Sequence, residues 1–508
     1  MTTNKRTHQR LLNEISVWTK SMNLKLKPVK CKSLSIVSGK PTPIEFKLGE
    51  NNVSSIKDDP HKFLGSHLSF SGKQQDVFDH VKDHFCTRLE RIDKLLVRGE
   101  YKVKIYKNYL LPSCRFILTV HDLTKTHLHA LDSIVHKYLK SWSGLAHSAA
   151  TEMFHIPHLL DIKSVYQLYL ESHATAHLSS RAKADPKVNI ALDSRLEREG
   201  NWTRKFSTIN YCQKAVDQVQ HSNPDASQKQ LKTALVKSIK DEVTETWYNH
   251  LKTLLVQGNM FLISLQEKSD HLWKSYIYNV PKGIMKFMLN SFADTLPTKN
   301  NLSRWGKRCN SKCSLCGNNE TLHHVLNNCK TMLDQGRYTW RHNSVLRKIM
   351  DALKNIKDHS WKIYCDLSDA TKTAGTTIPP EILPTQQRPD LVLINESSNS
   401  IVIIELSIPF EANIRKAHEY KENRYASLVS DLQERGYDTN LFCIEVGSRG
   451  LISSSNKQAL NSIFSQITNN KKSLKRAFNN FFKTISQCAM VCSYSIFYSK
   501  YDDDWATS

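Results

Sequence analysis

The sequence predicts a multidomain protein of mixed α+β and α/β class, mainly helical in its N-terminal half and α/β at its C-terminal end. The chain has 508 residues, more than a single hydrophobic core usually spans. Helical periodicity dominates residues 70–300, whereas the last third alternates short apolar runs with a helical stretch. Lys and Arg total 71 against 48 Asp and Glu, and the net charge of +23 favours nucleic acid as a partner.

Five segments follow one another along the chain. Residues 1–66 begin with a helical pattern and continue with short alternating runs interrupted by Gly and Pro, which indicates a helix followed by small hairpins. Residues 67–183 and 184–300 are amphipathic, basic and mainly helical. Residues 301–360 are locally basic and carry a cluster of cysteines and histidines. Residues 361–508 have the order strand, strand, helix, strand, which is typical of an α/β domain.

Targeting and membrane signals are missing from the sequence. No apolar run reaches the roughly 18 residues that a membrane-spanning helix needs. The first residues lack the apolar core of a signal peptide. We therefore expect an intracellular protein without a membrane partner.

The cysteine and histidine cluster has the spacing of a zinc knuckle. Four candidate ligands follow the pattern C-x2-C-x7-H-x4-C: Cys313, Cys316, His324 and Cys329. Three thiolates and one imidazole complete the tetrahedral coordination of a structural Zn²⁺. Two alternatives stay open, because His323 could replace His324 and Cys309 is a spare thiol just upstream. The basic residues around the cluster suggest that zinc holds a nucleic-acid-facing loop.

Two acidic residues flank the first two predicted C-terminal strands. Asp390 directly precedes the apolar run Leu391-Val-Leu-Ile. Glu405 ends the next run, Ile401-Val-Ile-Ile. A hairpin of these strands brings both carboxylates to one end of the sheet, where they can bind Mg²⁺ to polarise a phosphate and activate water. This is the PD-(D/E)xK arrangement of restriction-type nucleases, and it predicts a Mg²⁺-dependent DNA endonuclease.

The lysine expected two residues after the second acid is missing, because Ser407 occupies its position. The following helical stretch offers Lys416 and Lys421 instead. Lys421 shares a helix face with Tyr425, and that face continues into apolar residues. Lys421 is therefore the better-placed substitute to stabilise developing negative charge or to orient the water. The choice between the two lysines stays open.

Further short motifs accompany the knuckle and the acid pair: Arg337-Tyr-x-x-Arg-His-Asn343, Pro409-Phe-Glu411 and Lys421-x-x-Arg424-Tyr425. Together they resemble non-LTR retrotransposon proteins of the restriction-like-endonuclease lineage. In that family the active-site lysine lies on the helix, in agreement with the serine at its usual position. The resemblance implies metal binding by Asp390 and Glu405, and it implies supporting catalytic roles for Lys421 and Tyr425. It extends less directly to Glu411.

The resemblance also covers the earlier part of the chain. Leu24 to Leu34 resembles the reverse transcriptase palm segment that follows the polymerase acids, and Pro60 to Gly65 resembles the primer grip. The implied domains are a palm remnant at 1–66, a helical thumb-like region at 67–183, a helical linker region at 184–300, the CCHC zinc knuckle at 301–360 and a restriction-like endonuclease at 361–508.

The polymerase acids themselves are missing from this sequence. Tyr501-Asp-Asp-Asp504 resembles the Tyr/Phe-x-Asp-Asp turn, but no strand follows it. Asp294 lacks a second acid beside it. Nucleotidyl transfer needs two or three carboxylates for Mg²⁺, so we expect no reverse transcriptase activity from this chain alone.

We therefore expect a truncated retrotransposon protein that nicks a DNA target site and binds nucleic acid. The expected cofactors are structural Zn²⁺ and, for the nuclease, Mg²⁺. The expected partners are target DNA and the element's RNA or an RNA–DNA hybrid, without a small-molecule substrate. A chromosomal target implies a nuclear location, and Lys471 to Arg476 is a weak import signal. The alternative is a catalytically inactive transposon relic that acts only as a nucleic-acid-binding module.

Overall fold

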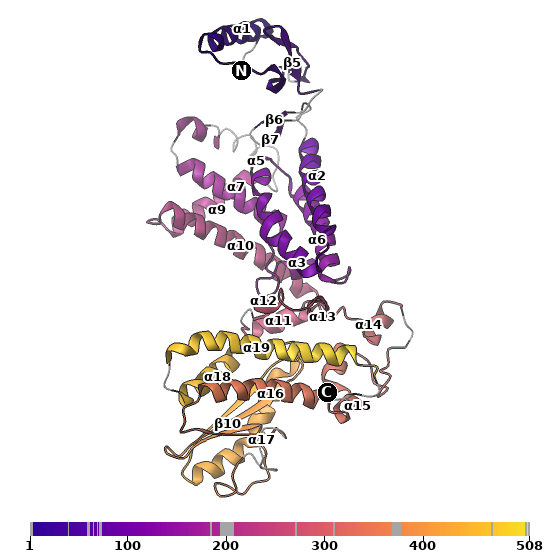
Figure 1. The fold of residues 1–508 in the computed structure, drawn as a ribbon, viewed down its shortest axis with the longest axis vertical. Coiled ribbons are helices and arrows are strands. Elements are labelled where there is room, and N and C mark those ends of the chain that lie inside the picture. Colours follow the sequence, from indigo (N-terminus) through magenta and orange to yellow (C-terminus); the bar gives the residue numbers. More distant parts are fainter. Residues whose placement is uncertain are drawn as a thin grey trace. The chain divides into compact units, whose positions relative to one another are not determined.

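The structure of the chain is a computed structural model (Figure 1). It describes residues 4–38, 40–57, 61–63, 66–68, 70, 74–182, 185–190, 192–193, 208–269, 272–307, 310–367, 378–468, 471–502 and 505. Some sequence features discussed above lie outside the described residues: Cys309, part of the Pro60–Gly65 segment, Asp503 with Asp504, and the side chains of Lys471 to Arg476.

The chain divides into two compact units. The first unit comprises Met1–Leu96, Lys104–Tyr138 and Lys163–Val243, and the second comprises Val97–Val103, Leu139–Ile162 and Thr244–Ser508. The chain is mainly helical with small mixed sheets, which agrees with the mixed α and β class predicted from the sequence. The five predicted domains stay predictions. None of the described helices is long and apolar enough to cross a membrane.

The first unit begins with a small sheet in the order β1-β5-β4, in which β1 and β5 are parallel and β4 is antiparallel to β5. Its buried core residues are Phe46, Leu48 and Val53. Gln9 caps the outer edge of β4, because its side-chain amide donates to Lys47 O at 2.7 Å and accepts from Lys47 N–H at 2.9 Å. The elements of this part are α1 (Lys5–Ser21), η1 (Pro28–Lys30), β1 (Lys32–Ser33), β2 (Ile36–Val37), β3 (Lys40–Pro41), β4 (Phe46–Leu48), β5 (Asn51–Ser55), β6 (His61–Phe63) and β7 (Ser66–Leu68).

A helical stretch follows as far as residue 253. Its helices are α2 (Gln74–Asp93), α3 (Gly99–Ile105), η2 (Tyr106–Leu110), α4 (Leu111–Ser113), α5 (Arg115–Val120), α6 (Lys125–Ser143), η3 (Thr151–Phe154), α7 (Val165–Ala182), α9 (Thr208–Ser222) and α10 (Gln228–Thr253). Asp132 caps the start of α7, because its carboxylate accepts the Val165 N–H at 2.6 Å and the Tyr166 N–H at 3.2 Å.

The rest of the second unit consists of short helices followed by an α/β sandwich. The helices before the sheet are α11 (Asn259–Gln266), α12 (Leu272–Tyr276), α13 (Lys282–Phe292), α14 (Lys299–Arg304), η4 (His324–Asn328), α15 (Lys330–Asp334) and α16 (Arg337–Ile356). The sandwich contains β8 (Lys362–Cys365), β9 (Leu391–Asn395), β10 (Ser400–Ser407), η5 (Glu411–Asn413), α17 (Ile414–Glu434), β11 (Asp438–Glu445), α18 (Ser454–Ile467) and α19 (Lys471–Tyr498).

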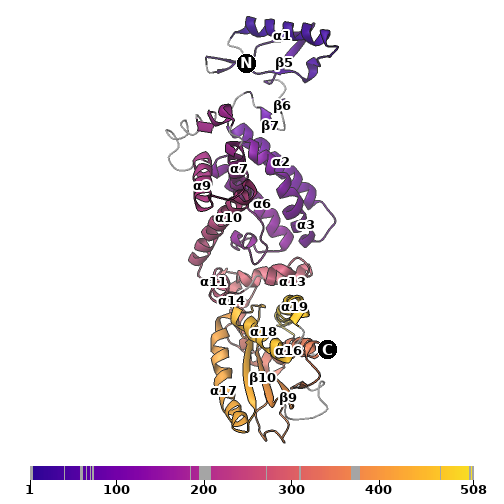
Figure 2. The same ribbon diagram turned by 90° about the vertical axis from the view of Figure 1, so that its left-hand side faces the viewer.

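The four strands of the sandwich lie in the order β11-β10-β9-β8. Strands β9 and β10 form an antiparallel hairpin, and β10 pairs in parallel with β11 after the chain crosses over through α17. Helix α17 covers one face of the sheet, and α16, α18 and α19 cover the other (Figure 2). The predicted order of strand, strand, helix and strand is therefore present, while the assignment of this sandwich to a nuclease stays a prediction.

Burial on both faces explains why the strand sequences are continuously apolar. On β10, Val402 and Ile404 pack towards α16 and α18. The alternate residues Ile401 and Ile403 pack towards α17. By the same alternation, Glu405 faces α17. The buried face of β10 therefore extends as far as Glu405, an acidic residue that is almost fully buried.

A buried ion pair holds the segment between β10 and α17. Glu411 accepts the Arg449 Nε–H at 2.7 Å and also the Arg449 backbone N–H. The Arg449 guanidinium donates to Ser291 O at 3.0 Å and lies 4.3 Å from the centre of the Phe410 ring. Glu411, which the family resemblance covered less directly, therefore has a structural role in this pair.

We predict that Glu411→Ala lowers the free energy of unfolding of the second unit by about 3–5 kcal/mol, because it leaves the Arg449 cation buried without a counter-charge. Urea denaturation followed by tryptophan fluorescence measures this loss, since the buried Trp273 indole donates to Arg449 O. Glu419→Ala on the exposed face of α17 is the matched control. The double variant Glu411→Leu with Arg449→Met should recover most of the loss. A single variant as stable as the control would contradict the structural role.

Candidate functional site

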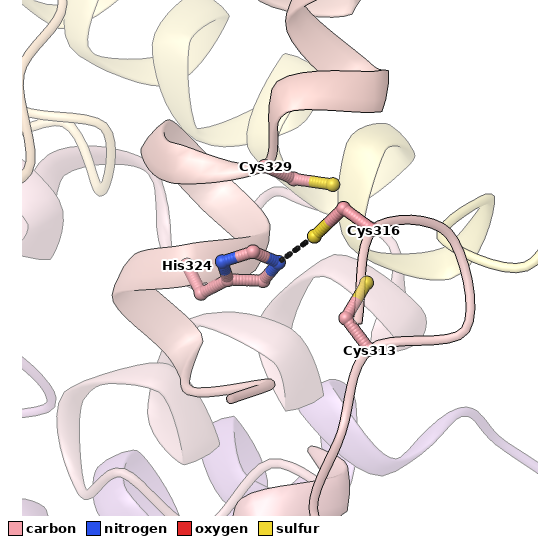
Figure 3. A group of neighbouring side chains, drawn as sticks. All are labelled: Cys313, Cys316, His324 and Cys329. Atoms are coloured by element: carbon pink, nitrogen blue, oxygen red, sulfur yellow. Dashed lines mark hydrogen bonds between the residues drawn. The ribbon is translucent and has the colours of Figure 1, made fainter. Parts of the chain in front are cut away.

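The first two zinc-ligand candidates lie on a short β-turn-like loop. The loop is closed at its base by the Lys312–Asn319 bridge and by the Cys313 N–H, which donates to Asn318 O at 2.7 Å. Gly317 N–H donates to Cys313 O at 3.0 Å, and Gly317 has a φ of +76°, where glycine is strongly favoured. The turn therefore brings the Cys313 and Cys316 thiols to the same side of the loop (Figure 3).

The other two candidates lie on the helical turn η4. Thr321 Oγ1 accepts the His324 N–H at 3.1 Å and caps this turn, and Cys329 follows its last residue. The four ligand atoms all lie within 4.8 Å of one another, and Cys316 Sγ lies 3.3 Å from His324 Nε2 (Figure 3). Bonds of about 2.3 Å to sulfur and 2.1 Å to nitrogen fit a tetrahedral Zn²⁺ among them. The chain therefore has a Cys₃His zinc site, and no carboxylate is needed to complete it.

The structure distinguishes His324 from its neighbour. His323 points away from the thiols: its Nε2 lies 3.3 Å from Asn413 Nδ2, and its ring centre lies 4.7 Å from that of Phe410. Consecutive residues on a helical turn point in different directions, so only one of the two histidines can face the cysteines. The prediction of His324 as the ligand is confirmed.

Protonation of the ligands agrees with metal binding. Burial lowers the pKa of His324, which favours the neutral imidazole that a metal requires. Burial also raises the pKa of Cys329 in the metal-free chain. Zinc must therefore displace a proton from this thiol, and binding is coupled to proton release.

Tyr338 of α16 anchors the knuckle from behind. Its hydroxyl accepts the Cys329 N–H at 3.1 Å and lies 3.0 Å from Val325 O, to which it donates. Thr331 Oγ1 donates to Leu315 O at 3.1 Å and ties α15 to the cysteine loop. The zinc-binding segment is thus held by hydrogen bonds from α15 and from α16, and α16 also packs against the C-terminal sheet.

The acid pair lies at one end of the β9–β10 hairpin. Leu391 pairs with Ile404, so Asp390 and Glu405 lie opposite each other at the next position. The Asp390 N–H donates to Glu405 Oε2 at 3.0 Å, and the Leu406 N–H donates to Asp390 Oδ2 at 2.7 Å. Burial and the nearby charge of Asp390 raise the pKa of Glu405. A cation between the two carboxylates would relieve this repulsion.

The structure places the two candidate lysines differently. Lys421 forms an ion pair with Glu405, whereas Lys416 lies on the exposed side of α17. Tyr425 is buried, and its hydroxyl donates to Arg388 O at 3.1 Å, so it holds the backbone just before Asp390. Burial raises the pKa of Tyr425 further above its usual range. Both side chains reach the strand end from α17, one turn apart.

His342 of α16 also reaches the acid pair, although the sequence analysis assigned it no role. Its Nε2 lies 3.2 Å from Asp390 Oδ2 and 3.2 Å from Leu406 O. Burial opposes protonation of this ring, but the hydrogen bond and charge of Asp390 prevail and raise its pKa. The sequence feature that could have identified His342 is its position in the Arg337 to Asn343 motif.

Glu445 forms a second acidic position beside the first. It ends β11, pairs with Ser407 in the strand register and is buried. His418 Nδ1 lies 3.1 Å from each of its carboxylate oxygens. Burial raises the pKa of Glu445, while His418 opposes this shift. The sequence signal was an acid that ends the third apolar run, as Glu405 ends the second.

Two of the basic residues near the knuckle point inwards. Arg337 is buried and donates to Ser499 O and Asp502 O. Arg341 is buried and donates to Ser493 Oγ and Ile408 O. The positive charge that the knuckle exposes at its surface is therefore smaller than the number of basic residues in its sequence suggests.

One comparison with known proteins bears on this site. Residues 249–334 match a protein family described as zinc-binding in reverse transcriptase. The match contains α11 to α15 and all four zinc ligands. No curated protein matches the chain. The chain therefore contains a zinc-binding domain of the reverse-transcriptase type and is a retroelement-associated protein.

We predict that the purified chain binds one Zn²⁺ and that His324→Ala abolishes this at moderate zinc concentrations, because it removes one of four ligands. His323→Ala is the matched control and should retain the metal, since its ring packs on Phe410. Elemental analysis after dialysis measures the zinc content. The thermal melting temperature should fall with loss of zinc, because the metal fixes η4 against the cysteine loop. Equal zinc loss in both variants would contradict the assignment.

Proposed function

We propose that this chain is part of a retrotransposon protein that binds nucleic acid and cleaves target DNA with the help of Mg²⁺ at Asp390 and Glu405. The observation that carries the proposal is the convergence of these two carboxylates with Lys421 at one strand end. The reverse-transcriptase type of the zinc-binding domain supports the retroelement context. The net charge of +23 supports a polyanionic substrate.

The donor set fits Mg²⁺, which prefers oxygen ligands and commonly takes one or two carboxylates from a protein. Asp390 Oδ2 and Leu406 O both lie 3.2 Å from His342 Nε2, so the imidazole holds the point that these two oxygens share in the metal-free chain. Glu405 is tied to the same position through the Asp390 N–H. Bound Mg²⁺ would supply a polarised phosphate and an activated water. The ion would replace part of the charge compensation that Lys421 and His342 provide.

The remaining residues have distinct roles in this proposal. Lys421 stabilises negative charge that develops on the phosphate, or orients the attacking water, from its place beside Glu405. His342 positions Asp390 through the contact between Nε2 and Oδ2. Tyr425 positions the backbone before Asp390, because its hydroxyl donates to Arg388 O.

A second candidate function is nucleic-acid binding without catalysis. The Lys421–Glu405 ion pair favours it, because this contact satisfies the acid in the metal-free chain. In both cases the partners would be DNA and the element's RNA or an RNA–DNA hybrid, and the location would be nuclear. Reverse transcription would depend on carboxylates that this sequence does not contain.

We predict that the protein nicks supercoiled plasmid in Mg²⁺ but not after Mg²⁺ is removed, and that Asp390→Ala abolishes nicking. Lys421→Ala should slow nicking by about 10²–10³-fold, because it removes one preorganised positive group from the reacting phosphate. Gel analysis of relaxed and linear plasmid measures the rates and shows whether one or both strands are cut.

Lys416→Ala is the matched control, since it removes the same charge from the exposed side of α17. It should nick at the wild-type rate. Failure of the zinc-loaded wild type to nick any DNA, including RNA-primed and branched substrates, with DNA binding retained, would favour the binding module.

A further inference from the structure

A hollow of about 420 Å³ connects the zinc-binding segment with the acid pair. Leu333 of α15 lines it on the zinc side, and Ser407 and Lys421 line it on the sheet side. Thr339 and Arg341 of α16 lie between them. Its volume is within the range of about 300–1,000 Å³ that is usual for ligand sites. None of these residues is a zinc ligand, and neither Asp390 nor Glu405 lines the hollow.

The charged side chains that line this hollow are all basic. Arg341, His342 and Lys421 contribute to its walls, together with the phenol of Tyr338. Among the described residues, no carboxylate lines it. Lys421 is paired with Glu405 and His342 with Asp390, so Arg341 supplies the excess positive charge that is complementary to an anion.

Arg341 is the unusual member of this group. Its side chain is 1% exposed, and its guanidinium donates to Ser493 Oγ at 2.9 Å and to Ile408 O at 3.3 Å. Within the described residues its Nε–H has no hydrogen-bond partner, and it forms no ion pair. Burial lowers the pKa of Arg341 to about 10, which leaves it cationic at neutral pH. The nearby Glu411 carboxylate favours the Arg341 cation but is itself paired with Arg449, so an anion in the hollow would compensate the buried Arg341 charge.

Asn327 also lines the hollow, next to Arg341. Its side-chain N–H donates to Ile408 O at 2.8 Å, the carbonyl that also accepts from Arg341. Its Oδ1 is buried without a partner among the described residues, and as an acceptor it does not itself bind a phosphate oxygen. Asn327 lies two residues before Cys329, so the zinc-binding turn itself contributes to the wall.

We propose that this hollow binds a backbone phosphate of a nucleic-acid strand and thereby aligns the neighbouring phosphodiester with the acid pair. The inference rests on the proposed function for the identity of that neighbouring site. Lys421 lines the hollow and contacts Glu405, and His342 lines the hollow and contacts Asp390. The hollow is therefore directly next to the acid pair.

A strand fits the hollow better than a free inorganic anion. The hollow is lined by residues of η4, α15, α16, β10 and α17, so it borders several surface segments that a strand can follow. Leu333 at its zinc end is 56% exposed and offers an apolar surface to a sugar or base. Arg341 lies beneath the surface and attracts a phosphate mainly through its electrostatic field. Such an attraction suits a phosphate in a strand whose adjacent phosphates are bound elsewhere on the protein.

The test is binding of a fluorescein-labelled single-stranded DNA oligonucleotide to the full-length, zinc-loaded chain in buffer without Mg²⁺. Thr339→Glu places a negative charge in the hollow at an exposed position in the first turn of α16, where an acidic residue also suits the helix. Asn355→Glu makes the same change of charge at an exposed position near the other end of α16.

We predict that Thr339→Glu weakens binding at least about tenfold, because a like charge then faces the phosphate. Asn355→Glu should change it by less than about threefold, through long-range repulsion alone. Fluorescence anisotropy measures both affinities. Arg341→Gln should also weaken binding and flatten its salt dependence, provided that zinc content and melting temperature show a folded chain.

The outcomes separate this inference from the nuclease proposal. If Thr339→Glu and Asn355→Glu bind DNA equally, the hollow is not a strand site, even where the wild type nicks plasmid. If Thr339→Glu alone loses binding, the strand site holds, even where no cleavage is found. If inorganic phosphate competes as well as the oligonucleotide at equal phosphate concentration, the site takes free anions and the inference is overturned.

Discussion

Burial of the β9–β10 hairpin on both of its faces is the constraint on which the rest of the second unit depends. Alternate side chains of β10 pack against α16 and α18 on one face and against α17 on the other. Helices α16 and α17, which cover opposite faces of the sheet, each carry a polar residue to the same strand end. His342 arrives from α16 and Lys421 arrives from α17. The hydrophobic effect thus positions the charged residues, because the apolar faces of the helices determine where their polar positions lie.

Helix α16 also connects the two candidate sites of this unit, the zinc site and the acid pair. Its first turn carries Tyr338, which hydrogen-bonds the backbone of the zinc-binding segment. Its next turn carries Arg341 and His342, and its remaining turns carry the apolar residues that pack on the sheet. A single rigid element therefore sets the spacing between the zinc site and the acid pair. The zinc site therefore lies at a fixed distance from the acid pair, although no residue of the acid pair is a zinc ligand.

Several parts of the site could be predicted because the relevant geometry is local. A C-x2-C spacing specifies a tight turn wherever it folds, so the zinc cysteines were identifiable from their separation. Two apolar runs with a short connection form a hairpin, and this brought Asp390 and Glu405 together. Helix periodicity favours Lys421 over Lys416 as the candidate lysine, because Lys421 shares a helix face with Tyr425, which is buried. Each of these inferences depends only on neighbouring residues.

Other parts depended on contacts between segments distant in the sequence. The sequence by itself determined the zinc ligands apart from the choice between His323 and His324, the hairpin acids and the helix that carries Lys421. Only the tertiary structure decided that His324 faces the thiols, that His342 reaches Asp390, and that Arg341 is buried beside a hollow. The physical reason is that periodicity and spacing determine which face of an element is apolar, whereas the partner of each polar residue depends on how separate elements pack.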